Sequence, residues 1–295
     1  PTPTVTGTSG GTFSATPSGL SINASTGAID LDASTMGTYA VKYVTSSSVC
    51  ADSTTFNVTL TATNTVSVNG AYDISTATFV QDYPVGSQDL TPTSITFNND
   101  GTKMYVLGDA GNDVNEYSLS TAFDISTASY VTNTAVAELY PSGMSFNNDG
   151  TKMFVIGYNY DYVLEYDLTT AFDINTASYA GSAERFFVRN EETYPHGLTF
   201  NNDGTKMYVI GNTGDDVNEY SLSIAFDVSS ASFAGNSERF SVSSEELYPH
   251  GLTFNNDGTK MFIIGVTGDD VNEYSLSVAF DVSSASFAGN SERFS

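Results

Sequence analysis

Basic side chains are scarce in this sequence of 295 residues, which carries 9 Lys and Arg against 34 Asp and Glu and a formal net charge of −25. A phosphate-binding surface needs clustered Lys and Arg, because counterion release supplies most of the affinity for DNA or RNA. The nine cations here are scattered singly along the chain. The composition therefore excludes most nucleic-acid binders, and we expect no nucleic-acid partner.

Long apolar runs are also missing. The longest, such as residues 207–210, extend over four or five positions, whereas a membrane-spanning helix needs roughly 18 to 20. We expect no membrane span in this segment. The chain begins with Pro1 and has no signal-peptide pattern, so we expect any export signal to lie upstream of it.

Tryptophan is absent and cysteine occurs once, at Cys50. A single cysteine forms no internal disulfide, so Cys50 is either a small buried residue or a thiol whose partner lies outside this segment. The sequence also contains no Ser/His/Asp set, Cys/His set, His-rich metal motif or phosphate-binding glycine loop. These absences argue against an enzyme.

The residues that are abundant favour an all-β fold. Val, Ile, Thr, Tyr and Phe dominate, and 25 Gly punctuate them, which is typical of many short strands and turns. Ser and Thr fill 26 of the first 65 positions, and the first Glu of the chain is Glu116. This change in composition predicts two domains, one over residues 1–65 and one over 66–295.

Alternation with a period of two marks the first domain. Tyr39, Val41 and Tyr43 share one face of a predicted strand, and Phe56 and Val58 share a face of another. Such alternation predicts a small antiparallel β-sandwich with one solvated face on each sheet.

The second domain is built on a repeat. Phe-Asn-Asn-Asp-Gly-Thr-Lys-Met begins at Phe97, Phe146, Phe200 and Phe254, with spacings of 49, 54 and 54 residues. Asn-Asn-Asp-Gly predicts a hairpin turn, and the apolar run after it predicts a strand covered on both faces. Four strands in each repeat predict blades of a β-propeller. We expect four to five blades, about residues 92–131, 141–180, 195–234 and 249–288, preceded by an isolated outer strand at 71–80.

Two resemblances extend these predictions. Residues 10–30, with Gly37-Thr-Tyr-Ala-Val-Lys-Tyr and Cys50, resemble the Ig-like stalk modules of very large secreted adhesins from gliding and marine bacteria. The turn and strand of each repeat resemble the blades of YVTN and lactonase-like propellers. The adhesin resemblance implies an Ig-like first domain, a cell-surface or extracellular location and a role in adhesion. The propeller resemblance implies an architecture and no catalytic residue.

Propeller topology brings several polar side chains to one rim. We expect a ligand-binding surface there that includes Tyr140, Tyr194, His196, Asp215, Asp216, Tyr248, His250, Asp269 and Asp270. The tyrosines could stack on sugar rings, and the oxygen-rich loops could hold Ca²⁺ through Asp109, Asp113, Asp215, Asp216, Asp269 and Asp270. We also expect ion pairs between blades, because four lysines share one repeat position and three Arg-Glu pairs share another.

These observations lead to a hypothesis of a non-catalytic module for extracellular adhesion. We expect it to contact a polysaccharide or a cell surface, alongside further repeats of the same polypeptide. Three alternatives remain open: a phage tail-fibre or receptor-binding domain, a glycan-active propeller enzyme, and a structural spacer of a surface filament.

Overall fold

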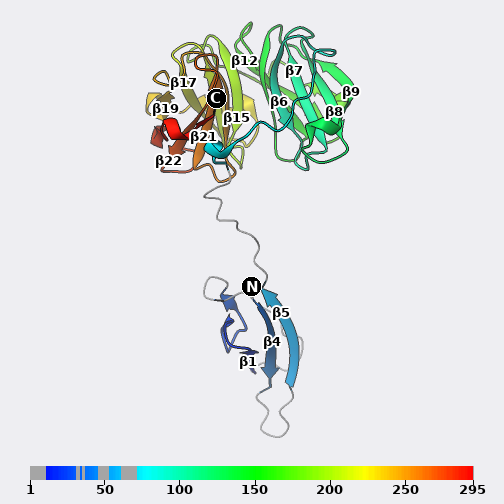
Figure 1. Ribbon diagram of the computed structural model, residues 1–295, viewed down its shortest axis with the longest axis vertical. Coiled ribbons are helices and arrows are strands. Elements are labelled where there is room, and N and C mark those ends of the chain that lie inside the picture. The colour runs from blue at the N-terminus through cyan, green and yellow to red at the C-terminus, as the bar shows by residue number, and fades with distance from the viewer. Residues whose placement is uncertain (1–10, 31–33, 35–36, 46–52, 61–71, 295) are drawn as a thin grey trace. The chain divides into compact units, whose positions relative to one another are not determined.

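The computed structural model describes residues 11–30, 34, 37–45, 53–60 and 72–294 (Figure 1). The chain divides into two compact units, residues 1–71 and 72–295. Cys50 and the predicted domain boundary between residues 65 and 66 lie outside the described residues. Within the described part of the chain, no helix is long and apolar enough to cross a membrane.

The first unit contains β1 (Thr12–Thr16), β2 (Ser21–Ile22), β3 (Ile29–Asp30), β4 (Gly37–Val44) and β5 (Ser53–Leu60). The strands β1, β4 and β5 form an antiparallel sheet in the order β1-β4-β5, and β2 pairs with β3. Tyr39, Val41 and Tyr43 are buried, whereas Lys42 between them is exposed. The predicted alternation of β4 is therefore confirmed, and the unit is all-β.

The second unit consists of four antiparallel sheets, one for each repeat. Each sheet has an inner strand, two central strands and an outer edge, and the strands follow one another in chain order. The first sheet contains β6 (Pro92–Phe97), β7 (Lys103–Gly108), β8 (Asp113–Leu119) and β9 (Ala128–Ala135). The second contains β10 (Pro141–Phe146), β11 (Lys152–Gly157), β12 (Tyr162–Leu168), β13 (Ala177–Tyr179) and β14 (Arg185–Phe187).

The last two sheets repeat the plan of the second. The third contains β15 (Pro195–Phe200), β16 (Lys206–Gly211), β17 (Asp216–Leu222), β18 (Ala231–Phe233) and β19 (Arg239–Ser241). The fourth contains β20 (Pro249–Phe254), β21 (Lys260–Gly265), β22 (Val271–Leu276), β23 (Ala285–Phe287) and β24 (Arg293–Phe294). Short 3₁₀ helices connect the strands: η1 (Ile74–Thr76), η2 (Ile125–Thr127), η3 (Ile174–Thr176), η4 (Val228–Ser230), η5 (Asn236–Glu238), η6 (Val282–Ser284) and η7 (Asn290–Glu292).

Apolar side chains hold consecutive sheets face to face. Phe154 and Ile156 of the second sheet pack into one cluster with Leu198 and Met207 of the third. Equivalent clusters join the first sheet to the second and the third to the fourth. Every residue of the run 207–210 is fully buried, as predicted for a strand covered on both faces. The arrangement is that of propeller blades.

The repeated turn closes as its chemistry predicts. In the third sheet, the Asn201 side chain accepts a hydrogen bond of 3.0 Å from the Lys206 amide, and the Asp203 side chain accepts one of 3.0 Å from Thr205. Gly204 has a φ of 71°, in the region that glycine tolerates best. The turns also bind one another: Asn99 donates to the carbonyl of Asn148, Asn148 to that of Asn202, and Asn202 to that of Asn256. This amide ladder joins all four sheets.

The outer edge is where the repeats differ. In the first sheet β9 pairs along β8 as one strand, whereas in the second to fourth sheets two short strands share the third strand. A glycine with positive φ lies between the two short strands, with φ of 107° at Gly181 and 114° at Gly235. The later repeats are about five residues longer at this place, so the chain leaves the sheet and then returns to it.

The predicted outer strand at 71–80 is wrong for the described residues 72–80. Residues 74–76 form η1 and residues 77–80 form no strand, because the segment has no third strand beside it to complete a ladder. Instead the Tyr72 hydroxyl donates to Asn256 at 2.8 Å, and Lys260 donates to the Tyr72 carbonyl at 3.3 Å. The segment then runs from the last sheet to the first (Figure 1).

The predicted ion pairs between blades are also wrong. Each lysine pairs within its own sheet, as Lys206 does with Glu219 at 2.7 Å, because β16 and β17 place them nearly opposite each other. Arg239 likewise pairs with Asp216 of its own sheet at 3.4 Å. The lysine reaches the next sheet only through a backbone carbonyl, that of Phe280, at 3.1 Å.

Candidate functional site

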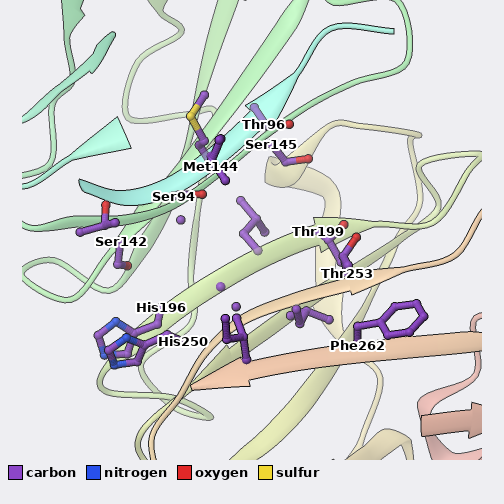
Figure 2. A pocket seen from close by; sticks show the side chains of 18 of the residues that line it. Ser94, Thr96, Ser142, Met144, Ser145, His196, Thr199, His250, Thr253 and Phe262 are labelled. Atoms are coloured by element: carbon purple, nitrogen blue, oxygen red, sulfur yellow. The ribbon is translucent and has the colours of Figure 1, made fainter. Parts of the chain in front are cut away.

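A cavity of about 450 Å³ lies among the inner strands of all four sheets. Its walls are residues 93–96, 142–145, 196–199 and 250–253, together with Phe262, Ile264 and Val271. Figure 2 shows His196 and His250 against each other at one end, with Thr199, Thr253 and Phe262 farther along. The four sheets therefore face a common centre, and within the described part of the chain no Lys or Arg lines this cavity.

Glycines let the inner strands approach each other closely beside this cavity. A Cβ at Gly143 would lie 2.4 Å from the His196 carbonyl oxygen, and one at Gly197 would lie 2.9 Å from that of His250. Neither position has room for a larger residue. The two histidines are thus brought together because β15 and β20 pack without side chains between them.

His196 and His250 begin adjacent inner strands and their rings stack with centroids 4.0 Å apart. Burial, and next to it the neighbouring His250, lowers the pKa of His196 to about 4. Burial also lowers the pKa of His250, although Glu246 opposes this shift. Both imidazoles are neutral at pH 7, when each carries one nitrogen that can accept a proton.

The two histidines differ in what holds them. The amide nitrogen of Asn212 lies 3.1 Å from Nε2 of His196, which fixes the orientation of that ring. The fourth repeat has Val266 in place of Asn212, and His250 is more exposed to solvent than His196. His250 is therefore the member of the pair that is open to a ligand.

The equivalent positions in the first two repeats carry hydroxyls that are already used. Thr93 donates to the Pro141 carbonyl at 2.9 Å, and Ser142 donates to the Pro195 carbonyl at 2.8 Å. Each hydroxyl ties one inner strand to the next. Both hydroxyls thus donate to backbone carbonyls and not to a histidine base, so they stabilise the packing of the inner strands.

A second hollow of about 300 Å³ lies at the histidine end and includes Thr91, Thr93, Ser142, Tyr158 and both histidines. Tyr158, which lines this hollow, contacts two further tyrosines: its ring stacks on Tyr140 with centroids 5.1 Å apart and an interplanar angle of 9°, and its centroid lies 6.4 Å from that of Tyr194. Tyr140, Tyr194 and Tyr248 are about half exposed. The structure thus brings Tyr140, Tyr194 and the histidine pair together.

Sequence reasoning missed Tyr158, which lies 5.7 Å from His196 and joins the tyrosines to the histidines. It follows the second strand of its repeat, where the other repeats carry Asp109, Asn212 and Val266. Tyr158 is the one aromatic residue at this repeat position, and this difference among the four repeats could have identified it as a candidate site residue.

The six aspartates predicted to hold Ca²⁺ do not form one site. Asp113, Asp216 and Asp270 are buried, and each accepts a hydrogen bond from the Asn two positions later. Arg239 lies 3.4 Å from Asp216, and Arg293 lies 3.2 Å from Asp270. Burial raises the pKa of Asp215 and of Asp216. Among the described residues, Asp109, Asp215 and Asp269 join no cluster of three ligating groups.

Three buried glutamates beneath the rim were also missed. Glu138, Glu192 and Glu246 are fully buried. Glu192 accepts hydrogen bonds from the amides of Tyr194 at 2.8 Å and Thr213 at 2.9 Å, and Glu246 does the same for Tyr248 and Thr267. The carboxylates of Glu192 and Glu246 therefore connect the loop before the inner strand to the loop after the second strand, whereas Glu138 accepts from the amides of Leu139 and Tyr140. Each glutamate lies three residues before the proline of a Pro-Ser or Pro-His pair, and this recurrence was the signal in the sequence.

Comparison with known proteins identifies similar folds only. No protein-family model and no curated protein matches the chain. Similar solved structures include a protein from Lactobacillus plantarum, at 13% identity and a TM-score of 0.47, with 85% of this chain and 64% of that chain covered. A protein of Bacteroides uniformis proposed to be a 6-phosphogluconolactonase has 13% identity, a TM-score of 0.46 and the same coverages.

A periplasmic gluconolactonase of Pseudomonas aeruginosa is also similar, at 12% identity and a TM-score of 0.43, with 85% of this chain and 62% of that chain covered. The chain thus spans less than two thirds of the length of these three proteins. They overturn three of the predictions from sequence. The adhesin assignment, the adhesion and carbohydrate-binding function and the exclusion of an enzyme are corrected here, because two of these three similar structures are named as lactonases and none is named as an adhesin.

Proposed function

We propose that the chain is a hydrolase that binds a small, uncharged, hydroxyl-rich molecule at the histidine end of the cavity and opens an ester bond in it, a lactone being the simplest such substrate. The observation that carries this proposal is the neutral pair of His196 and His250, stacked at 4.0 Å where the two hollows meet.

The lining of the two hollows has no basic groups among its described residues, which favours an uncharged substrate over an anionic one. Neither hollow has a Lys or Arg among its described lining residues, and the chain carries a formal net charge of −25. A phosphorylated or carboxylated substrate would approach a protein of like net charge and find no cation in the site to pair with it. Hydroxyl groups, in contrast, can exchange hydrogen bonds with imidazole nitrogens and tyrosine hydroxyls.

The step requires a base and water. His250 accepts a proton from a water molecule while the water oxygen attacks the ester carbonyl carbon. The C–O bond to the alkoxy group then breaks, and the imidazolium returns the proton to the leaving oxygen. His196 positions its neighbour by stacking, with Asn212 holding its ring. Water attacks directly in this mechanism. We assign no nucleophilic role to Thr93 or Ser142, because both hydroxyls donate to backbone carbonyls.

The test is the hydrolysis of glucono-1,5-lactone by the full chain, with the spontaneous rate subtracted. We expect turnover that His250→Gln lowers by 10²- to 10⁴-fold, the contribution typical of a general base. The matched control is Asp167→Asn, an exposed change on β12 outside both hollows. Absence of turnover above the spontaneous rate, or full activity in His250→Gln, would contradict the proposal.

The dependence on substrate charge and pH gives a second test. We expect the phosphorylated lactone to be hydrolysed more slowly than the neutral one. Burial lowers the pKa of His250 below the ordinary histidine value of 6.5. The base therefore becomes protonated only at a pH below 6.5, and kcat/KM should keep its neutral-pH value down to about pH 6.5 before it falls.

Two broader features belong to the same proposal. We propose that the first unit is an Ig-like sandwich, which its three-stranded sheet and its alternating β4 support. We also propose an extracellular location, which the acidic composition supports.

A further inference from the structure

Residues 72–89 connect the last sheet to the first, and they begin with a contact that elsewhere joins consecutive sheets. Tyr72 corresponds to Phe280 in the repeat, and both have a positive φ, 63° and 57°. The Phe280 carbonyl accepts a hydrogen bond of 3.1 Å from Lys206 of the preceding sheet. The Tyr72 carbonyl accepts one of 3.3 Å from Lys260 of the last sheet. This end of the segment therefore contacts the last sheet as a following sheet would.

The other end contacts the first sheet as a preceding sheet would. Tyr83 packs edge to face on Tyr117 of the first sheet, with centroids 5.8 Å apart. Phe240 of the third sheet packs in the same way on Tyr274 of the fourth, at 5.5 Å. Asp89 accepts hydrogen bonds of 2.7 and 2.9 Å from two loop amides of the first sheet, as the buried glutamates do in the later repeats. One segment thus makes both sets of contacts that the outer edge of a single sheet makes.

The strand that such an outer edge pairs with has no counterpart among the described residues. No hydrogen bond in the described structure reaches the backbone of residues 78–80. Phe79 is 77% exposed, whereas Phe233 at the same repeat position packs on Tyr220 of its own third strand at 5.7 Å. Both the backbone and the ring therefore lack the partner that they have in the other repeats.

The two sheets on either side of the segment each have an apolar face that no described sheet covers. Ile264 of the last sheet is half exposed, whereas Ile156 at the same position packs against Leu198 of the following sheet. On the first sheet a hollow of about 320 Å³ is lined by residues 92–95 with Tyr83, Val85, Met104, Val106 and Ile125. The two uncovered faces are thus the two halves of the interface that already joins consecutive sheets.

We propose that the space between these two faces binds one further copy of the repeat. The copy would contribute three antiparallel strands of the kind at residues 195–222, and residues 77–84 would become its outer strand. Its apolar second strand would then cover both uncovered faces, as in a strand buried on both sides. Its third strand would pair with residues 78–80 and cover Phe79.

The length of the segment agrees with this assignment. Tyr72 and Val85 are 13 residues apart, and so are Phe123 and Val136, which flank the single outer strand of the first sheet. The same chain length therefore suffices to form an outer strand and to reach the next sheet. The proposal does not depend on the proposed hydrolysis, because no residue of the histidine pair takes part in it.

The first experiment extends the full chain by a copy of residues 242–276 placed after Ser295, which corresponds to Ser241 in the repeat. We expect hydrogen exchange at the amides of residues 78–80 to slow by more than about tenfold, because these amides gain a partner strand. The Tm should rise by roughly 5 °C or more, because apolar faces become buried.

The matched control carries Met261→Asp and Ile263→Asp in the added copy alone. Both residues pack against the preceding sheet, so the altered copy cannot cover Ile264, and the exchange rates and the Tm should stay at their original values. Phe79→Ala should lower the Tm by more in the extended chain than in the original one. Unchanged exchange in the extended chain, or the same protection in the control, would overturn the proposal.

The second experiment leaves the chain as it is and decides the question if the extended chain does not fold. A dye-labelled peptide of residues 242–276 is titrated with the full chain and followed by fluorescence anisotropy. We expect saturable binding that the peptide with both aspartates lacks, and no binding would overturn the proposal. Sedimentation of the chain alone tests a different occupant: a dimer in which residues 78–80 are already protected would assign the space to a second copy of the chain and overturn the proposal as well.

Discussion

The His196 side chain illustrates how burial at a single residue sets a protonation state. In the unfolded chain its pKa is near 6.5, whereas burial and His250 lower the pKa in the folded protein to about 4. As the pH falls from 6.5 to 4, the unfolded state binds the proton first, so the free energy of unfolding falls. The loss is at most about 3 kcal/mol at 1.36 kcal/mol for each pKa unit.

We therefore predict that His196→Gln flattens the acid limb of the stability curve over this range. Urea denaturation at a series of pH values measures the free energy of unfolding of the wild type and of His196→Gln. The contributions of the carboxylates cancel in the difference between the two proteins. Two parallel curves would mean that His196 titrates normally, and an NMR titration of its imidazole would then place its pKa near 6.5.

Within a single element, the repeated turn allows little variation. Gly204 has a φ of 71°, and a Cβ there would lie 2.2 Å from the Phe226 ring. We predict that Gly204→Ala destabilises the protein by about 1–3 kcal/mol from the backbone conformation alone, with the clash adding to this. Gly86, where a Cβ would meet nothing within 4 Å, provides the control: Gly86→Ala should be neutral or slightly stabilising. If chemical denaturation showed equal losses of unfolding free energy for Gly204→Ala and Gly86→Ala, the explanation from backbone conformation and steric clash at Gly204 would be refuted.

The same scale shows what the sequence could predict. The turn and the inner strands depend on residues within a few positions of each other, so residues 195–234 were delimited well for β15 to β18. The pairing of Lys206 with Glu219 depends on strand register, and the stack of His196 on His250 depends on the distance between two sheets. Neither is encoded in local spacing. For this reason the sequence predicted the ion pairs between the wrong sheets, and it placed both histidines on one rim without predicting that their rings stack.

At the scale of the second unit, the faces of the first and last sheets that no other described sheet covers differ from the faces between sheets. Ile264 is 50% exposed, whereas Ile210 at the same repeat position is fully buried. Ile95 of the first sheet is likewise 57% exposed, against 5% for Leu198. Residues at equivalent repeat positions therefore contribute differently to stability, according to whether a neighbouring sheet covers them.

We predict that Ile210→Ala costs about 2–5 kcal/mol, as large-to-small changes in a core do, and that Ile264→Ala costs less than about 1 kcal/mol. Equilibrium urea unfolding compares the two at matched protein concentration. A similar cost at both positions would show that the last sheet is covered in solution.

The amide ladder has a consequence for how such a protein changes over generations. Asn99, Asn148, Asn202 and Asn256 occupy one repeat position, and each of the first three reaches the backbone of the next turn. Residues 194–241 and 248–295 differ at only four of 48 positions. Unequal crossing-over between such copies would insert or delete a unit that already carries both halves of its junction, so the gene can lengthen or shorten this array without first evolving a new interface.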